Sequence, residues 1–200
     1  MPMLEQRIQQ QFFDSADLKY AAAEVLSKPI ADAVSALVGC ITGAGKVLVC
    51  GNGASASAAQ SFAAGFVGRF ERERPGLAAI ALSADVSVIT AIAMDAAFDA
   101  IFAKQVQALG APGDILLAIT TNGDAANLLA AVRAARNKEM TVIALTGNHG
   151  GELRELLTET DVHIGIPHER ETRVREVHQL VLHCLCDAVD LQLLGEQENT

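Results

Sequence analysis

Short, continuously apolar runs recur along the chain, each ending near glycine, threonine or proline. They occupy positions 46–51, 77–82, 114–121, 141–147 and 161–167. Continuous rather than alternating hydrophobicity is typical of strands that are covered on both faces. Ala- and Leu-rich stretches with helical spacing lie between them, at about 55–69, 86–109 and 125–138. Strand and helix therefore alternate, which predicts an α/β fold with a mostly parallel sheet and right-handed crossovers.

The two ends of the chain are predicted to be helical. Two helices, near 3–26 and 30–43, precede the first strand and are separated around Pro29, which suits a helix start. The last helix, about 171–194, carries one wide apolar face, at positions 174, 177, 181, 184, 185 and 188. The N-terminal helices have no obvious sheet to cover within one subunit, so we expect a homo-oligomer.

No repeat, low-complexity tract or long linker divides the chain. We therefore predict a single domain over 1–200, with N-terminal helices at about 3–43 used in oligomer packing, a core at about 46–194 and a tail at 195–200.

Composition narrows the classes of function. Half of the 200 residues are hydrophobic and the formal net charge is −9, which argues against direct nucleic-acid binding because that affinity depends on Lys and Arg neutralising phosphates. The polar start and the lack of a sufficiently long apolar run predict a cytoplasmic protein with no membrane segment. The four cysteines show no paired C-x-x-C spacing and are expected to be reduced thiols: Cys40, Cys50, Cys184 and Cys186.

Two strand-to-helix loops have the form of an anion site. The first, 50–55, offers Asn52, Gly53 and Ser55, and the second, 120–124, offers Thr120, Thr121 and Asn122. Ligands bind beyond the carboxyl ends of strands in doubly wound sheets, where helix N-termini present free N–H groups to anions. The alternative is that these are ordinary turns in which Ser55 and Asp124 act as N-caps. The presence of two such loops in corresponding positions favours a phosphosugar pocket.

Over nearly its whole length the chain resembles the phosphoheptose isomerase family. The shared segments are GNGAS at 51–55, GRF at 68–70 with RP at 74–75, AMD at 93–95, TTNG at 120–123, ALTG at 144–147 with GG at 150–151, and IPH at 166–168. The resemblance implies a sugar-isomerase (SIS) domain: a three-layer, doubly wound, five-stranded parallel sheet with flavodoxin-like strand order and extra N-terminal helices. It also implies a homotetramer with phosphosugar sites between subunits, and it adds Asp95 to the predicted phosphosugar-binding residues.

The catalytic residues of that family are incomplete here. Its members interconvert sedoheptulose 7-phosphate and a heptose 7-phosphate through an enediol, using a Glu base and a His one turn earlier, where this chain has Gly65 and Ser61. On the last helix the family has Gln and His, where this chain has Arg175 and His183. His183 is the one predicted catalytic residue, with a partly buried, non-catalytic histidine as the alternative.

Metal and phosphate binding are expected to be weakened as well. Some family members hold zinc with the same four positions, of which only His183 remains a ligand here, so we predict no metal and no cofactor. Asp124 stands where the family has Asn, and a carboxylate at a helix N-terminus would repel phosphate. Arg175 either supplies a positive charge to the ligand or forms an internal ion pair.

Within the same superfamily the chain resembles most closely the DnaA initiator-associating (DiaA) group. The segments concerned are SA at 55–56, AA at 63–64, FERERP at 70–75, AKQVQALG at 103–110, GGEL at 150–153 and CLCD at 184–187. That resemblance implies a non-catalytic protein that binds the DnaA replication initiator and promotes initiation. Leu193 and Leu194 match the initiator-binding pair, with burial in a subunit interface as the alternative. Two other hypotheses stay open: a sedoheptulose 7-phosphate isomerase and a phosphosugar sensor.

Overall fold

The computed structural model describes residues 2–196, whose framework is one five-stranded sheet. The strands are β1 (Val47–Gly51), β2 (Ala79–Ala81), β3 (Ile115–Ile119), β4 (Thr141–Gly147) and β5 (Val162–Ile166). Neighbouring strands all pair in parallel, in the order β2-β1-β3-β4-β5. The predicted doubly wound parallel sheet with flavodoxin-like order is confirmed.

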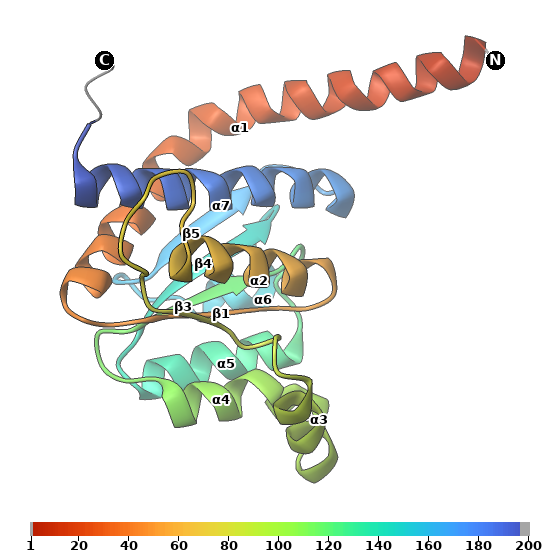
Figure 1. The fold of residues 1–200 in the computed structure, drawn as a ribbon. Coiled ribbons are helices and arrows are strands. Elements are labelled where there is room, and N and C mark those ends of the chain that lie inside the picture. The colour runs from red at the N-terminus through yellow and green to blue at the C-terminus, as the bar shows by residue number, and fades with distance from the viewer. Residues whose placement is uncertain (1, 197–200) are drawn as a thin grey trace.

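Helices cover both faces of the sheet (Figure 1). One face packs against α1 (Pro2–Thr42), α2 (Ala54–Val67) and α7 (Glu171–Leu194), and the other against α3 (Val86–Asp95), α4 (Ile101–Leu109), α5 (Ala126–Asn137) and α6 (Gly151–Glu155). Alternate strand residues point to opposite faces, so Val47 and Val49 enter the first core while Leu48 and Cys50 enter the second. The three layers explain why the strands read as continuously apolar.

The prediction of two N-terminal helices is wrong, because Pro29 lies inside a single helix of 41 residues. Proline removes one backbone donor and its ring crowds the preceding turn, which bends a helix without necessarily ending it. In Figure 1, α1 changes direction between its red N-terminal and its orange C-terminal part. The sequence therefore predicted the position at which the helix is irregular, but the prediction that the helix ends there was wrong.

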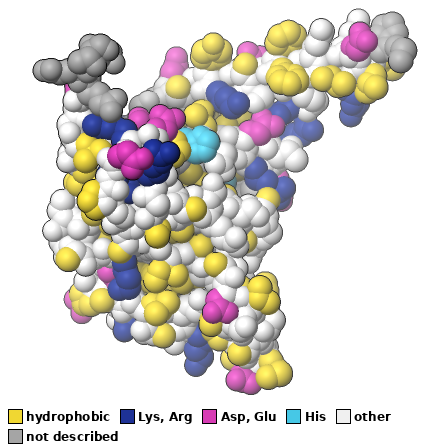
Figure 2. All heavy atoms as spheres, in the orientation of Figure 1, with side chains coloured by type: hydrophobic (Ala, Val, Ile, Leu, Met, Phe, Trp, Pro, Cys, Tyr) yellow, Lys and Arg dark blue, Asp and Glu magenta, His cyan; other side chains and the backbone are white. Residues whose placement is uncertain are grey.

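The two parts of α1 have different surroundings. Its second half covers the sheet beside α7 and buries Leu26, Ala33 and Leu37, so the expectation that this segment finds no sheet within the subunit is wrong there. Its first turns project from the body as an arm (Figure 1). Hydrophobic side chains run along this arm in Figure 2, and the exposed ones include Met3, Leu4, Ile8, Phe12 and Phe13.

The predicted helix over 86–109 is interrupted. α3 ends at Asp95, a short 3₁₀ helix spans Phe98–Ala100, and α4 follows. Ala97 adopts extended backbone with φ −177°. No glycine or proline near this position indicates that the helix is interrupted here. The single-turn helix α6 was not predicted either.

The last helix, α7, begins and ends where the sequence predicted. Two helices, α1 and α7, are long and apolar enough to cross a bilayer by length and composition alone, but core helices of soluble proteins meet the same criterion. The apolar face of α7 packs on the sheet, with Val174, Val177, Val181 and Leu185 buried.

Candidate functional site

A crevice opens where β1 and β3 end. The two strands are neighbours, but the helices that follow them, α2 and α5, cover opposite faces of the sheet. Their N-termini therefore meet at the carboxyl edge of the sheet, at the point where the winding direction changes. Such a point is the usual ligand position in open α/β sheets, and uncapped helix N-termini present N–H donors to anions.

The β1–α2 turn depends on glycine and leaves α2 without a side-chain cap. A Cβ on Gly51 would lie 2.7 Å from the Cβ of Ser55, so only glycine permits this close approach. Gly53, with φ 56°, is the N-cap residue, and no side chain caps the helix. Ser55 is buried and lines the crevice. The N-cap interpretation of Ser55 is therefore wrong.

The β3–α5 loop is organised by its own polar groups. The Thr120 hydroxyl accepts a hydrogen bond from the backbone N–H of Gly123 at 3.2 Å and donates to Oδ1 of Asn122 at 3.3 Å. Gly123 has φ 86°, and a Cβ there would collide with the carbonyl oxygen of Gly150. Thr120, Thr121 and Asn122 all line the crevice, and no side chain caps α5.

Asp124 is not placed as expected. Its Oδ1 accepts a hydrogen bond from the backbone N–H of Glu152 at 3.0 Å, at the start of α6. A Cβ on Gly151 would lie 2.2 Å from the same oxygen, so the β4–α6 loop is shaped around this carboxylate. Asp124 therefore neither caps α5 nor lines the crevice. In this geometry the Asp124 carboxylate does not face the smaller hollow, so it would not contact a phosphate there directly.

A reciprocal pair of amides joins the two loops. Nδ2 of Asn52 donates to Oδ1 of Asn127 at 2.8 Å, and Nδ2 of Asn127 donates back to Oδ1 of Asn52 at 2.9 Å. Asn127 is buried in the first turn of α5. The pair fixes the separation of the two helix N-termini. Asn127 was not singled out from the sequence, where a lone Asn in a helical stretch carries little signal.

The crevice has two ends. It consists of adjoining hollows of about 280 and 390 Å³ that share Ala54, Ser55, Ile119 and Arg175. The smaller hollow lies at the two glycine-containing loops and the helix N-termini, which suits an anion. The larger lies between α2 and α7 and is lined by small and polar groups, including Ser57, Ser61, His178 and Gln179.

Arg175 forms an ion pair and also lines the crevice, and its contact with a ligand stays a prediction. Its guanidinium pairs with Glu171 at 2.6 Å on the exposed surface of α7, as the internal ion-pair interpretation requires. It also lines both hollows and is the one cation among their lining residues within the described part of the chain. Because an exposed i,i+4 ion pair contributes well under about 1 kcal/mol, this pairing does not prevent Arg175 from meeting an anion.

His183 lies outside both hollows. Its Nε2 is 2.7 Å from Nε2 of Gln179, and its ring centroid lies 5.5 Å from that of Phe70, with the two ring planes tilted by 41°. The side chain is exposed, so the alternative of a partly buried core histidine does not describe it. Gly65 is nearby on α2: a Cβ there would meet Cys186 and Phe70 at ordinary distances of 3.6 and 3.9 Å.

His178 is a site residue that the sequence did not reveal. It is 2% exposed and lines the larger hollow. Neither ring nitrogen forms a hydrogen bond with the described chain. Burial lowers the pKa of His178 to about 4; the neighbouring Thr146 carbonyl opposes that shift and Arg175 adds to it. The available signal was a polar residue on the apolar face of the last helix.

Three predicted residues are not brought to the crevice. Asp95 is exposed at the C-terminal end of α3, outside both hollows. Leu193 packs against the hydrophobic core beside the sheet, while Leu194 is exposed at the end of α7.

A buried ion pair holds the two walls of the larger hollow together. Nε of Arg74 lies 2.5 Å from Oδ1 of Asp190 on α7, and both side chains are 1% exposed. The same guanidinium donates to the carbonyls of Gly65 and Phe66, each at 2.8 Å, at the end of α2. Removing one partner of such a pair costs roughly 3–5 kcal/mol because the other charge stays buried.

The residues present do not fit the zinc site of the family. The corresponding positions are Ser61, Gly65, Arg175 and His183, and zinc in proteins takes three or four nitrogen, sulfur or carboxylate ligands. Among residues 2–196 no group of three or more His, Cys, Asp or Glu side chains is arranged to hold a metal ion.

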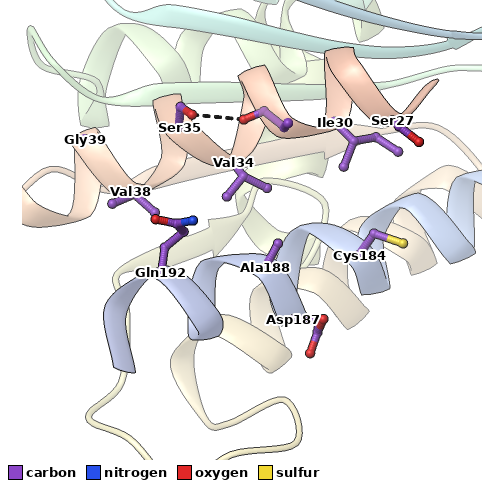
Figure 3. Close-up of a pocket in the computed structure, with 11 residues that line it drawn as sticks. Ser27, Ile30, Val34, Ser35, Val38, Gly39, Cys184, Asp187, Ala188 and Gln192 are labelled. Carbon is purple, nitrogen blue, oxygen red and sulfur yellow. Dashed lines mark hydrogen bonds between the residues drawn. The ribbon is translucent and has the colours of Figure 1, made fainter. Parts of the chain in front are cut away.

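A groove larger than either hollow lies elsewhere, between α1 and α7. It measures about 740 Å³ and is lined mostly by small and apolar side chains. In Figure 3, Ile30, Val34 and Val38 of α1 face Cys184 and Ala188 of α7, while the Ser35 hydroxyl turns back to its own helix. This chemistry suits protein packing rather than a phosphosugar.

Comparison with known proteins agrees with the fold and the crevice. Residues 11–147 match the family model described as "SIS domain". A phosphoheptose isomerase of Methylibium petroleiphilum is 72% identical over the full length of both chains. The structure of phosphoheptose isomerase GmhA from Neisseria gonorrhoeae superposes with a TM-score of 0.89 at 43% identity, covering 94% of this chain and 98% of the other. A phosphoheptose isomerase from Francisella tularensis gives 0.87 at 44%, covering 92% and 97%.

The chain is thus an SIS-domain protein. More specifically, it belongs to the phosphoheptose isomerase family.

The predicted DnaA-associating function is wrong. A full-length relative at 72% identity and another at 55%, from Aromatoleum aromaticum, are phosphoheptose isomerases by name, as are both structures described above. The prediction rested on short shared segments and on the missing Glu at position 65. One lost side chain does not identify a protein-binding function, because most of a crevice can persist around it. The isomerase hypothesis fits the comparisons better.

Proposed function

We propose that the chain acts on a phosphorylated seven-carbon sugar as a phosphoheptose isomerase, interconverting ketose and aldose forms in the crevice between β1 and β3. The observation that carries this proposal is the polarised crevice: two uncapped helix N-termini and Arg175 at one end, and a polar hollow at the other. The full-length relatives named phosphoheptose isomerase support the same substrate class. We expect the protein to act in the cytoplasm.

The smaller hollow would receive the phosphate. Thr120, Thr121 and Ser55 supply hydroxyl donors, and Asn52, Gly53 and Asn122 complete the two loops. Backbone N–H groups of α2 and α5 and the guanidinium of Arg175 add favourable electrostatics for a dianion. Since Asp124 is turned to α6, no carboxylate among the described residues opposes the phosphate from inside the hollow.

The larger hollow would hold the reacting end of the sugar. Isomerisation moves a proton from one carbon to its neighbour through an enediol, which needs groups that accept and return protons. No Asp or Glu lines this hollow among the described residues, so proton transfer would fall to imidazoles: His178, which lines the hollow, and His183, which lies outside it and contacts Gln179. Loss of a carboxylate base typically costs about 10²–10⁴-fold in rate, so we expect slow turnover.

The test is conversion of sedoheptulose 7-phosphate, followed by separating and quantifying the heptose 7-phosphate formed. Arg175→Met should raise KM about tenfold, since one charge-assisted contact to phosphate is lost. Arg136→Met, at an exposed position on α5, is the matched control and should behave as wild type. Neither conversion nor saturable binding by the folded protein would contradict the proposal.

A further inference from the structure

His178 has hydrogen-bonding capacity that the protein does not use. Its ring is 2% exposed, and both Nδ1 and Nε2 lack hydrogen-bond partners among the described residues. A buried polar group without a partner costs about 1–3 kcal/mol, so such groups are uncommon in folded proteins. Other buried polar side chains are paired, since Gln105 donates to two carbonyls and Asn127 pairs with Asn52, although Nε of Arg173 and Oδ2 of Asp190 also have no partner among the described residues.

The position of His178 indicates that a hydrogen-bond partner for its ring would be a bound ligand. His178 lies on α7 and lines the larger hollow together with Ser55, Ser61 and Gln179. A ligand that fills this hollow therefore meets the ring directly. His183, five residues further along the same helix, is outside the hollow and already contacts Gln179 and Phe70.

The neighbours of His178 indicate which ring nitrogen is the donor and which is the acceptor. The carbonyl oxygen of Thr146 lies on one side of His178 and favours a proton on the ring, because a carbonyl only accepts hydrogen bonds. A neutral imidazole carries one N–H donor and one acceptor nitrogen. With the N–H directed towards the carbonyl, the other nitrogen is an acceptor, and the group that suits it is a hydroxyl donor.

We propose that His178 is a sugar-contacting residue, whose acceptor nitrogen receives a hydrogen bond from a hydroxyl of the bound phosphosugar. This inference rests on the proposed function and adds which end of the ligand faces α7. The phosphate occupies the smaller hollow at the helix N-termini, and the sugar hydroxyls extend past Ser55 into the larger hollow. Inorganic phosphate alone fills the first hollow and does not reach His178.

The substitution His178→Phe separates this role from a structural one. Phenylalanine keeps the ring volume and removes both buried nitrogens, neither of which has a well-formed hydrogen bond in the described chain, so the variant should fold with stability close to that of wild type at neutral pH. It should bind sedoheptulose 7-phosphate about tenfold more weakly, because the sugar hydroxyl loses its acceptor. Binding of inorganic phosphate should stay unchanged. His149→Phe, at an exposed position outside both hollows, is the matched control.

The measurement is calorimetric titration of the full chain with each of the two probes, with the melting temperature recorded for every variant. In addition, ¹⁵N-histidine spectra of the wild type should show the His178 ring signals shifting with sedoheptulose 7-phosphate and staying in place with inorganic phosphate. This second readout does not depend on a variant folding.

The outcomes are distinguishable. Wild-type affinity for the sugar phosphate in His178→Phe, or unmoved His178 signals in a protein that binds the sugar phosphate, would overturn the inference alone. Equal loss of phosphate and sugar phosphate binding would also overturn it, because the histidine would then only maintain the crevice. Failure of the wild type to bind the sugar phosphate would contradict the proposed function itself.

Discussion

Gly65 is one of three positions, with Ser61 and Arg175, at which this chain differs from the catalytic residues that the family resemblance implies. A Cβ at this position would make only ordinary contacts with Cys186 and Phe70, so the backbone near the end of α2 accepts a side chain at position 65. The Phe70 ring in turn contacts the His183 ring, with centroids 5.5 Å apart. We therefore expect a carboxylate introduced at position 65 to lie in the same neighbourhood as the His183 imidazole.

Gly65→Glu should accordingly fold and increase the rate of sedoheptulose 7-phosphate conversion by about 10²–10⁴-fold, the usual contribution of a general base. Replacing a glycine in the last turn of α2 should also stabilise the helix, by less than about 1 kcal/mol. Gly65→Gln is the control, since it has the same size and no basic carboxylate. Equal turnover in both variants and wild type would show that a base at this position cannot reach the substrate.

His178 also makes the stability of the protein depend on pH. Burial lowers its pKa to about 4 from the usual histidine value of 6.5, so between these values the unfolded chain binds more protons than the folded one. Stability should therefore be fully present above about pH 6.5 and fall as the pH decreases towards 4, by roughly 2 kcal/mol between pH 7 and pH 5. Urea unfolding across this range measures the loss, and His178→Phe should show a flatter profile. An identical slope in the variant would assign the dependence to other groups.

At the scale of the elements, the sequence predicts the positions of buried strands and helices better than it predicts where a helix bends or breaks. All five strands and α7 lie where the pattern of apolar residues predicted them. Strands buried on both faces need apolar residues at successive positions, and that pattern is visible in the sequence. The kink at Pro29 and the break at Ala97 were misjudged. Whether a proline bends or ends a helix depends on packing against α7 and the sheet, and the run around Ala97 contains no residue that enforces its extended backbone.

The candidate site shows the same limit. Both loops were predicted because glycine and hydroxyl residues after a strand have few other uses, and the structure brings them together at the crevice. The direction of each side chain was not predictable. Asp124 bonds to α6, His183 contacts Phe70, and His178 lines the hollow. These orientations depend on tertiary contacts, which the order of residues along the chain does not specify.

At the scale of the whole molecule, the arm of α1 and the groove between α1 and α7 leave apolar surface without a partner in one subunit. We expect the protein to assemble as a homotetramer through these surfaces. An assembly that brings α3 of one copy to the crevice of another would also place Asp95 near a ligand, which the single chain does not.

Phe12→Ser with Phe13→Ser should therefore lower the mass measured by light scattering, because the exposed aromatic side chains of the arm are lost from the interface. Tyr20→Ser, on the same helix and also exposed, tests whether the effect is confined to the first turns. A wild-type protein that is monomeric at micromolar concentration would contradict the assembly.

The central claim is that one crevice binds a phosphosugar in a defined direction. The most direct measurement is a crystal structure of the protein with sedoheptulose 7-phosphate. The account predicts phosphate at the N-termini of α2 and α5, within reach of Thr120 and Arg175, and a sugar hydroxyl against His178. A phosphosugar bound in the reverse direction, or in the groove between α1 and α7, would contradict it.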